Sequence, residues 1–170
     1  AGRQGVIPRM RVVSNSTPLI ALSRIGKLDI LHILFGSIII PQAVFHEVVT
    51  EGASWPGANE VQNATWIDVQ RVENAVAVAV LASDLDRGES EAIVLAKEVG
   101  ADYLLVDEKK ARRIAKWSGI KVIGTAAILG IAAKKKLLNL DVAFEELARN
   151  GFRFSDAVRS RVKADWCSGK

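Results

Sequence analysis

The segment RVVSNSTPL, residues 11–19, decides the fold because it joins two kinds of secondary structure. Its first four residues are a short run rich in β-branched side chains, which predicts a strand. Asn15, Ser16 and Thr17 come next and are residue types that cap helices, while Pro18 suits a first helical turn. The segment therefore predicts a strand that passes directly into a helix.

The same alternation continues along the chain. Further strands are predicted at residues 37–40, 66–69, 103–106 and 120–123. Helices are predicted at residues 19–22, 28–34, 42–49, 74–82, 88–99, 109–117, 126–133, 141–149 and 155–164, with a helical turn or two within 55–65. Residues 74–82 alternate Val and Ala and fit either state, but the Ala content favours a helix.

Strands that alternate with helices through short loops predict a central parallel sheet with helices on both faces. The expected fold class is therefore α/β, a three-layer α/β/α sandwich. In such sheets ligands bind outside the carboxyl ends of the strands. The residues that directly follow each strand are the first candidates for a functional site.

The length and composition indicate a globular protein. A chain of 170 residues is typical of one domain, and no apolar run approaches the ~20 residues that span a bilayer. The only cysteine is Cys167, which excludes an internal disulfide and favours a cytoplasmic location. Residues 1–10, without a methionine start or an apolar signal core, are expected to be an N-terminal tail.

Charge is distributed unevenly along the chain, although the net charge is only +4. Residues 1–11 carry three arginines and no acid; residues 12–96 carry ten acidic and four basic residues; residues 97–170 carry sixteen basic and nine acidic residues. An acidic cluster binds divalent cations and a basic surface attracts phosphate. The alternative is that the charges are segregated by chance.

Four oxygen-bearing side chains lie at or near the ends of predicted strands or the starts of the helices that follow. They are Asn15, Glu47, Glu89 and Asp107. If they converge, they form the oxygen-rich site that Mg²⁺ or Mn²⁺ prefers, and such an ion supports phosphodiester cleavage. Each acid also has a simpler interpretation. Glu89 suits a helix dipole, Asp107 suits a helix cap, and Glu47 suits a solvated surface.

Basic and aromatic residues near Asp107 and elsewhere allow two interpretations. Four cations follow Asp107 within a helical turn or two, where they either contact phosphate or face solvent: Lys109, Lys110, Arg112 and Arg113. Trp55 and Trp66 either stack on bases or pack in the core, and packing is favoured. The zinc-protease pattern, both common glycine-rich nucleotide-binding loops and the Gly-x-Ser-x-Gly pattern are absent from the sequence.

Four segments occur in the order and spacing of PIN-domain proteins. They are VVSNSTPLIAL (12–22), IPQAVFHEV (40–48), LDRGESEAI (85–93) and LLVDEKKAR (104–112). The chain thus resembles a prokaryotic PIN-like branch of predicted nucleic-acid-binding proteins related to VapC-type toxins. The resemblance delimits a PIN-like domain over residues 11–154 and leaves residues 155–170 as a C-terminal helical extension.

The resemblance implies a Rossmann-like fold and a Mg²⁺- or Mn²⁺-dependent endoribonuclease. The expected substrate is RNA, in particular single-stranded RNA. The resemblance also implies a homodimer and, if the chain is the toxin of a toxin–antitoxin pair, a small antitoxin partner. By position, Asn15 matches the family's first aspartate, Glu47 its glutamate, Glu89 the acid that opens the long helix, and Asp107 the acid after the fourth strand. Glu91 and Glu108 are the alternates for the last two positions.

Two residues depart from the family pattern. Asn15 offers an amide oxygen without negative charge, so metal binding is expected to be weaker than in an all-acid site. Val106 stands where many PIN domains carry a hydroxyl residue. Three hypotheses follow: a metal-dependent ribonuclease, a nucleic-acid-binding protein without catalysis, and a protein-interaction scaffold whose acidic cleft receives a basic segment. In the first, Glu47, Glu89 and Asp107 hold the metal directly or through water, and Asn15 orients a ligand water.

Overall fold

The computed structural model describes residues 10–55 and 57–167. Within these residues, five strands form one parallel sheet in the order β3-β2-β1-β4-β5. They are β1 (Val12–Ser14), β2 (Ile38–Pro41), β3 (Ile67–Gln70), β4 (Tyr103–Leu105) and β5 (Val122–Ile123). β1 is central, with Val13 in register with Ile39 of β2 and Leu104 of β4. The alternation of strands and helices therefore predicted the sheet correctly.

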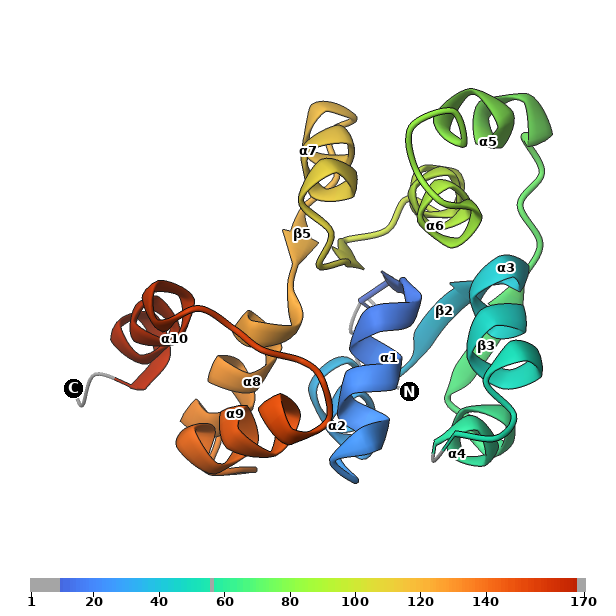
Figure 1. The fold of residues 1–170 in the computed structure, drawn as a ribbon. Helices are drawn as coiled ribbons and strands as arrows, with labels where there is room; N and C mark the ends of the chain where they lie inside the picture. The colour runs from blue at the N-terminus through green and yellow to red at the C-terminus, as the bar shows by residue number, and fades with distance from the viewer. Residues whose placement is uncertain (1–9, 56, 168–170) are drawn as a thin grey trace, which may run out of the picture.

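One face of the sheet is covered by helices from both ends of the chain. They are α1 (Ser16–Arg24), α2 (Asp29–Phe35), α8 (Thr125–Lys134) and α9 (Leu140–Arg149), with α10 (Asp156–Val162) beside α8. α1, α2, α8 and α9 enclose a core that includes Val12, Ile38 and Leu105 of the strands. Figure 1 shows these helices together on one side.

The opposite face is covered by α6 (Arg87–Glu98) and α7 (Lys109–Trp117), and α5 (Ala75–Leu81) packs against α6. This second core includes Val13 and Leu104, so neighbouring residues of one strand face opposite layers, as the pleat requires. The three layers are visible in Figure 1. The α/β/α sandwich expected from the sequence is the observed fold.

Several element boundaries differ from the sequence predictions. β5 contains only two residues, and Ile120, predicted to begin this strand, lies before it and packs in the second core. The helix predicted to end at residue 49 is α3 (Gln42–Phe45) followed by a π-helix, η1 (His46–Glu51). The helical turn predicted within 55–65 is α4 (Ala58–Asn63), and the last helix, α10, continues as a second π-helix, η2 (Lys163–Cys167).

The carboxyl ends of the strands define one edge of the molecule where the candidate residues gather. Asn15 follows β1, and Gln42 begins α3 directly after β2. α6 reaches the same edge through α3, because the backbone N–H of Ala43 donates to Glu91 Oε1 at 3.1 Å. Across the described ranges, no helix has the length and apolar character needed to cross a membrane.

Candidate functional site

Asn15 lies at the point where β1 becomes α1. Its backbone N–H donates to the carbonyl oxygen of Leu105 at 2.9 Å, which ties the junction to β4. The side chain is only 5% exposed and makes no capping bond to α1. Its Oδ1 atom has no hydrogen-bond partner among residues 10–55 and 57–167. A buried amide oxygen without a partner costs ~1–3 kcal/mol, which suits a group that binds a cation or water.

Glu47 approaches Asn15 from the π-helix η1. Ser16 Oγ donates to Glu47 Oε2 at 2.6 Å, so the first residue of α1 orients this carboxylate. Both side chains lie against Gly88 of α6. A Cβ atom at Gly88 would lie 3.2 Å from Glu47 Oε2 and 3.5 Å from Asn15 Oδ1. Any larger residue at position 88 would therefore enter the space that these two oxygens line.

Asp86 completes this arrangement, and the sequence interpretation did not select it. The same Gly88 Cβ position lies 3.6 Å from Asp86 Oδ1. We refer to Asn15 Oδ1, Glu47 Oε2 and Asp86 Oδ1 as the oxygen cluster. Asp86 and Gly88 line a cavity of about 540 Å³ with Glu47, and this cavity opens to solvent between α3, η1 and α6.

Asp86 and Glu89 are linked by reciprocal hydrogen bonds at the start of α6. The Glu89 backbone N–H donates to Asp86 Oδ1 at 2.7 Å, and the Asp86 backbone N–H donates to Glu89 Oε1 at 3.0 Å. This is a capping box, and the Asp-x-x-Glu spacing is the sequence signal that could have identified Asp86. Glu89 thus contributes to the helix start, as its simpler interpretation expected.

Glu89 is also electrostatically unusual. The side chain is buried, at 7% exposure, beside two other carboxylates. Burial raises the pKa of Glu89 from an ordinary 4.5 to about 7, and repulsion from Asp86 and Glu108 adds to the rise. Glu89 therefore exchanges a proton near neutral pH, a property that suits acid–base chemistry.

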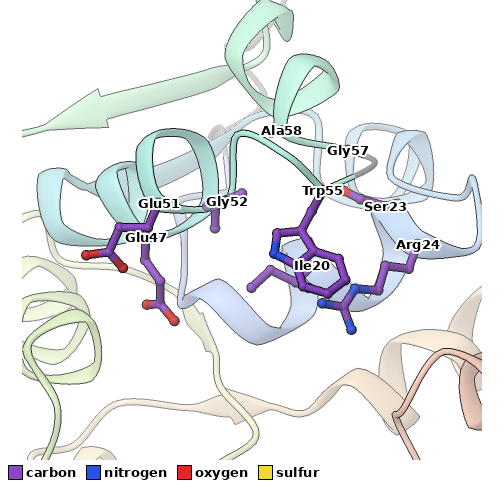
Figure 2. A pocket seen from close by; sticks show the side chains of 10 residues that line it. Ile20, Ser23, Arg24, Glu47, Glu51, Gly52, Trp55, Gly57 and Ala58 are labelled. Carbon is purple, nitrogen blue, oxygen red and sulfur yellow. The ribbon is translucent and has the colours of Figure 1, made fainter.

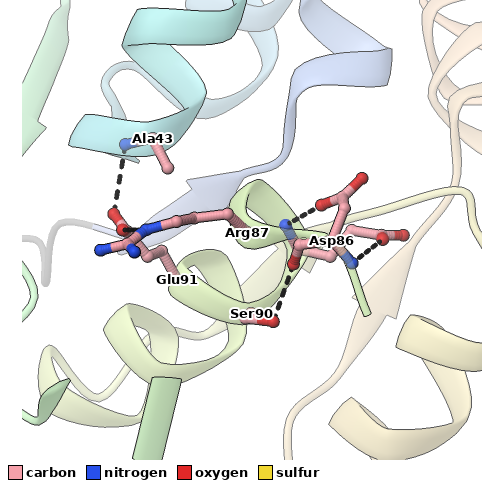
Figure 3. Close-up of polar contacts among 6 residues, drawn as sticks. Ala43, Asp86, Arg87, Ser90 and Glu91 are labelled. Atoms are coloured by element: carbon pink, nitrogen blue, oxygen red, sulfur yellow. Dashed lines mark hydrogen bonds and ion pairs between the residues drawn. The ribbon is translucent and has the colours of Figure 1, made fainter. Parts of the chain in front are cut away.

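Glu91, the alternate to Glu89, has a structural role. Its Oε1 accepts the Ala43 N–H that joins α3 to α6, and its Oε2 accepts from Arg87 Nε at 2.9 Å (Figure 3). Both oxygens are therefore hydrogen-bonded within the protein. Glu108, the alternate to Asp107, caps α7 by accepting from the Ala111 N–H at 2.7 Å. That bond lowers the pKa of Glu108, assisted by Lys110 and Arg113.

Asp107 follows β4 and is held by the next helix rather than by its own. Its Oδ1 accepts from the Thr125 backbone N–H at 2.7 Å, and its Oδ2 accepts from Thr125 Oγ1 at 2.5 Å. Thr125 is the first residue of α8, so the carboxylate lies at the positive end of that helix. Thr125 supplies a hydroxyl near the site that Val106 lacks. No described hydrogen bond or ion pair joins Asp107 to the oxygen cluster.

The basic residues of α7 form a stripe beside Asp107. Lys109, Arg112, Arg113 and Lys116 follow the 3.6-residue period and line a cavity of about 480 Å³ with Asp107 and Trp117. Trp117 is 78% exposed, and the Arg113 guanidinium carbon lies 5.5 Å from its ring centroid. Lys110 does not line this cavity. It forms an ion pair with Asp84, with Nζ and Oδ1 3.2 Å apart.

The oxygens of the site can be compared with the ligands that the expected Mg²⁺ or Mn²⁺ requires. In the part of the chain that the structure describes, no three His, Cys, Asp or Glu side chains are grouped to hold a metal. The oxygen cluster instead combines two carboxylates with one buried amide oxygen. Mg²⁺ is commonly bound through one or two carboxylates and several waters. These residues therefore fit a hydrated divalent cation.

The sequence also matches a known protein family. A family model described as a PIN domain matches residues 11–167. The chain belongs to the PIN-domain family. The match includes α10 and η2 at the C-terminus of this PIN domain, and it supports a nuclease-type fold with nucleic-acid binding and divalent-metal dependence. No curated protein matches the chain.

Proposed function

We propose that the chain is a divalent-metal-dependent ribonuclease that hydrolyses phosphodiester bonds in single-stranded RNA. The observation that carries this proposal is the oxygen cluster, in which a buried, unpartnered amide oxygen and two carboxylates meet at a glycine. Such a set is typical of a site for a hard cation. The adjacent basic stripe on α7 gives the complementary charge that an RNA backbone requires.

The proposed catalytic residues are Asn15, Glu47, Glu89 and Asp107, to which the oxygen cluster adds Asp86. Asn15, Glu47 and Asp86 would hold Mg²⁺ or Mn²⁺, which when bound polarises a phosphoryl oxygen and acidifies water. Ser16 fixes the Glu47 carboxylate through its hydroxyl. Glu91 is excluded from the proposed set because its two oxygens bind the Ala43 N–H and the Arg87 guanidinium, and Glu108 because its side chain is exposed and caps α7.

The chain's own groups would manage protons and phosphate charge. Glu89, whose pKa is about 7, would take or release a proton at its carboxylate near neutral pH. Asp107 is fixed by two donors from Thr125 and would orient water or a ligand group at the boundary with the basic stripe. Lys109, Arg112 and Arg113 would bind phosphate oxygens, whereas Lys110, already paired with Asp84, would contribute less.

A cleavage assay tests the proposal. A 5′-labelled single-stranded RNA should be cut in Mn²⁺ or Mg²⁺ and left intact when EDTA is present. Asp107→Asn should abolish the cleavage, and Glu47→Gln should lower its rate by about 100-fold. Cleavage by both variants at the rate of the unmodified protein would overturn the assignment.

A second candidate, a nucleic-acid-binding protein without catalysis, is favoured by the neutral side chain of Asn15. One fewer negative charge weakens divalent binding. This candidate predicts salt-dependent RNA binding without cleavage product, together with metal binding restored in Asn15→Asp.

We also propose, from the family resemblance, that the chain forms a homodimer and is the toxin of a toxin–antitoxin pair. Light scattering of the purified chain tests the homodimer. Co-purification with the product of a neighbouring small gene tests the antitoxin.

A further inference from the structure

We propose that a second cavity, beside Trp55, is a subsite for one unpaired nucleobase of the RNA; this inference rests on the proposed function. The cavity measures about 240 Å³ and lies between α1, η1 and α4. Figure 2 shows the Trp55 indole lying over Ile20, with Arg24 beside it. Cavities for drug-sized ligands measure ~300–1,000 Å³, so this one suits a single flat ring system.

Trp55 supplies a preformed aromatic wall. Packing was the favoured interpretation from the sequence, and it is wrong for this residue: Trp55 is 58% exposed, whereas Trp66 packs against the first core. The Arg24 guanidinium carbon lies 4.6 Å from the Trp55 ring centroid and 5.1 Å from that of Phe152. Arg24 Nη1 also donates to the Asn150 carbonyl oxygen at 3.1 Å.

These contacts fix the indole from one side without burying it. An aromatic surface that is already positioned loses little conformational entropy when a flat ligand stacks on it. Stacking of a base on an aromatic side chain is worth ~1–3 kcal/mol and tolerates any base. The exposed indole thus offers a stacking surface to an unpaired base. A base within a duplex already stacks on its neighbours and does not require this surface.

Small residues form part of the cavity wall. Gly57 has a φ of 104°, and a Cβ atom there would lie 2.2 Å from the Ser23 Cβ. Only glycine therefore allows the start of α4 to approach α1 this closely. Gly52 and Ala58 add no bulk on the neighbouring walls.

Glu47 connects this cavity to the oxygen cluster. It lines both the 240 Å³ cavity and the 540 Å³ cavity that contains Asp86 and Gly88. A base beside Trp55 would therefore belong to a nucleotide next to the phosphate at the cluster. Glu51 also lines both cavities, so the two cavities share one wall of η1.

Binding of an abasic-scanned RNA tests the subsite without depending on catalysis. Fluorescence anisotropy in EDTA would follow single-stranded oligonucleotides that lack one base at successive positions. The unmodified protein should lose about 5- to 150-fold in affinity at one position, the equivalent of ~1–3 kcal/mol of stacking. Trp55→Ala and Trp55→Leu should bind the intact and the abasic oligonucleotide equally, and Trp55→Phe should restore most of the difference.

Trp117→Ala is the matched control, because Trp117 is exposed on α7 outside this cavity. It should weaken all oligonucleotides alike and leave the position-specific loss in place. The inference fails if RNA binds but no position is sensitive, or if the sensitive position persists unchanged in both Trp55 variants that lack a ring. Absence of any RNA binding in EDTA overturns the subsite, whereas the proposed function fails only if no RNA is cleaved in Mn²⁺ or Mg²⁺.

Discussion

The carboxyl edge of the sheet has two corners of opposite character. The acidic corner lies between β1, β2 and α6 and holds Asn15, Glu47, Asp86 and Glu89. The basic corner lies between β4, β5 and α7 and holds Asp107 with the Lys109, Arg112, Arg113 and Lys116 stripe. In the acidic corner the oxygen cluster forms no ion pair among the described residues, and the nearby Arg87 is paired with Glu91. In the basic corner a single carboxylate is satisfied by Thr125 beside several cations.

The difference follows the charge distribution of the sequence. Asn15, Glu47, Asp86 and Glu89 all come from the acidic segment 12–96, and α7 comes from the basic segment 97–170. Cation binding requires carboxylates that are not neutralised, whereas phosphate binding requires exposed cations. Keeping the two sets in separate corners prevents them from neutralising each other.

Loss of one charge from the acidic corner should have the largest effect. Glu47→Gln keeps the shape and can still accept from Ser16, but it leaves Asp86 as the only charged member of the oxygen cluster. Mn²⁺-dependent RNA cleavage should fall by about 100-fold in single-turnover assays. Glu60→Gln, an exposed carboxylate on α4, is the control and should retain full activity. A reduction of only a few-fold in Glu47→Gln would remove that residue from the metal site.

Adding a charge to the same corner should strengthen metal binding. Asn15→Asp should raise Mn²⁺ affinity by about 10-fold in calorimetric titrations, because ligand charge sets divalent affinity. The same change should destabilise the metal-free protein by ~1–3 kcal/mol in urea unfolding, since position 15 is 5% exposed and faces Glu47. Unchanged Mn²⁺ affinity would contradict a metal at this corner.

Glu89 should make stability depend on pH. Its folded pKa is about 7, above the ordinary 4.5, so its proton stabilises the folded state. That contribution is complete below pH 4.5 and is lost as the pH rises through 7. Glu89→Gln mimics the protonated form and should be more stable than the unmodified protein by ~1–2 kcal/mol at pH 8, with no difference at pH 4.5.

Chemical denaturation across this pH range measures the effect. Glu91→Gln is the comparison, because its carboxylate binds the Ala43 N–H and Arg87, and its loss should destabilise the protein at pH 8. A difference between Glu89→Gln and the unmodified protein that does not change with pH would show that burial does not raise the Glu89 pKa.

In the basic corner, individual cations should have smaller, additive effects. Arg112→Ala and Arg113→Ala should each reduce the salt dependence of RNA binding by about one unit of slope. Lys110→Ala should change the slope less, because Lys110 is paired with Asp84. Binding titrations from 50 to 200 mM salt test this order. Equal effects of all three substitutions would mean that position along the sequence, rather than the face of α7, decides phosphate contact.

The sequence predicted the fold and much of the neighbourhood of the site, because both depend on repeated local patterns. Strand-to-helix junctions identified β1 and its alternation with helices, so the edge where Asn15 and Asp107 lie could be expected. Asp86 was missed because an aspartate before a helix is explained by capping alone. Its proximity to Glu47 and Asn15 around Gly88 arises only in the folded structure, where α6 lies beside η1.

The directions in which side chains point were the other feature that the sequence did not predict. Lys110 and Lys109 are neighbours in sequence, yet a helix turns 100° per residue, so only Lys109 joins the stripe on α7. Trp55 and Trp66 are both flanked by short helical or strand segments, but only Trp66 reaches the core. The hydroxyl bond of Thr125 to Asp107 depends on the position of α8, which lies far from Asp107 in the sequence.

We propose that the acidic corner holds the divalent cation. Anomalous diffraction from crystals soaked in Mn²⁺ would locate that cation. We predict a peak bounded by Asn15 Oδ1, Glu47 Oε2 and Asp86 Oδ1, and its disappearance in Glu47→Gln crystals. A peak found only beside Asp107 and Thr125, or no peak at a Mn²⁺ concentration that supports RNA cleavage, would contradict it.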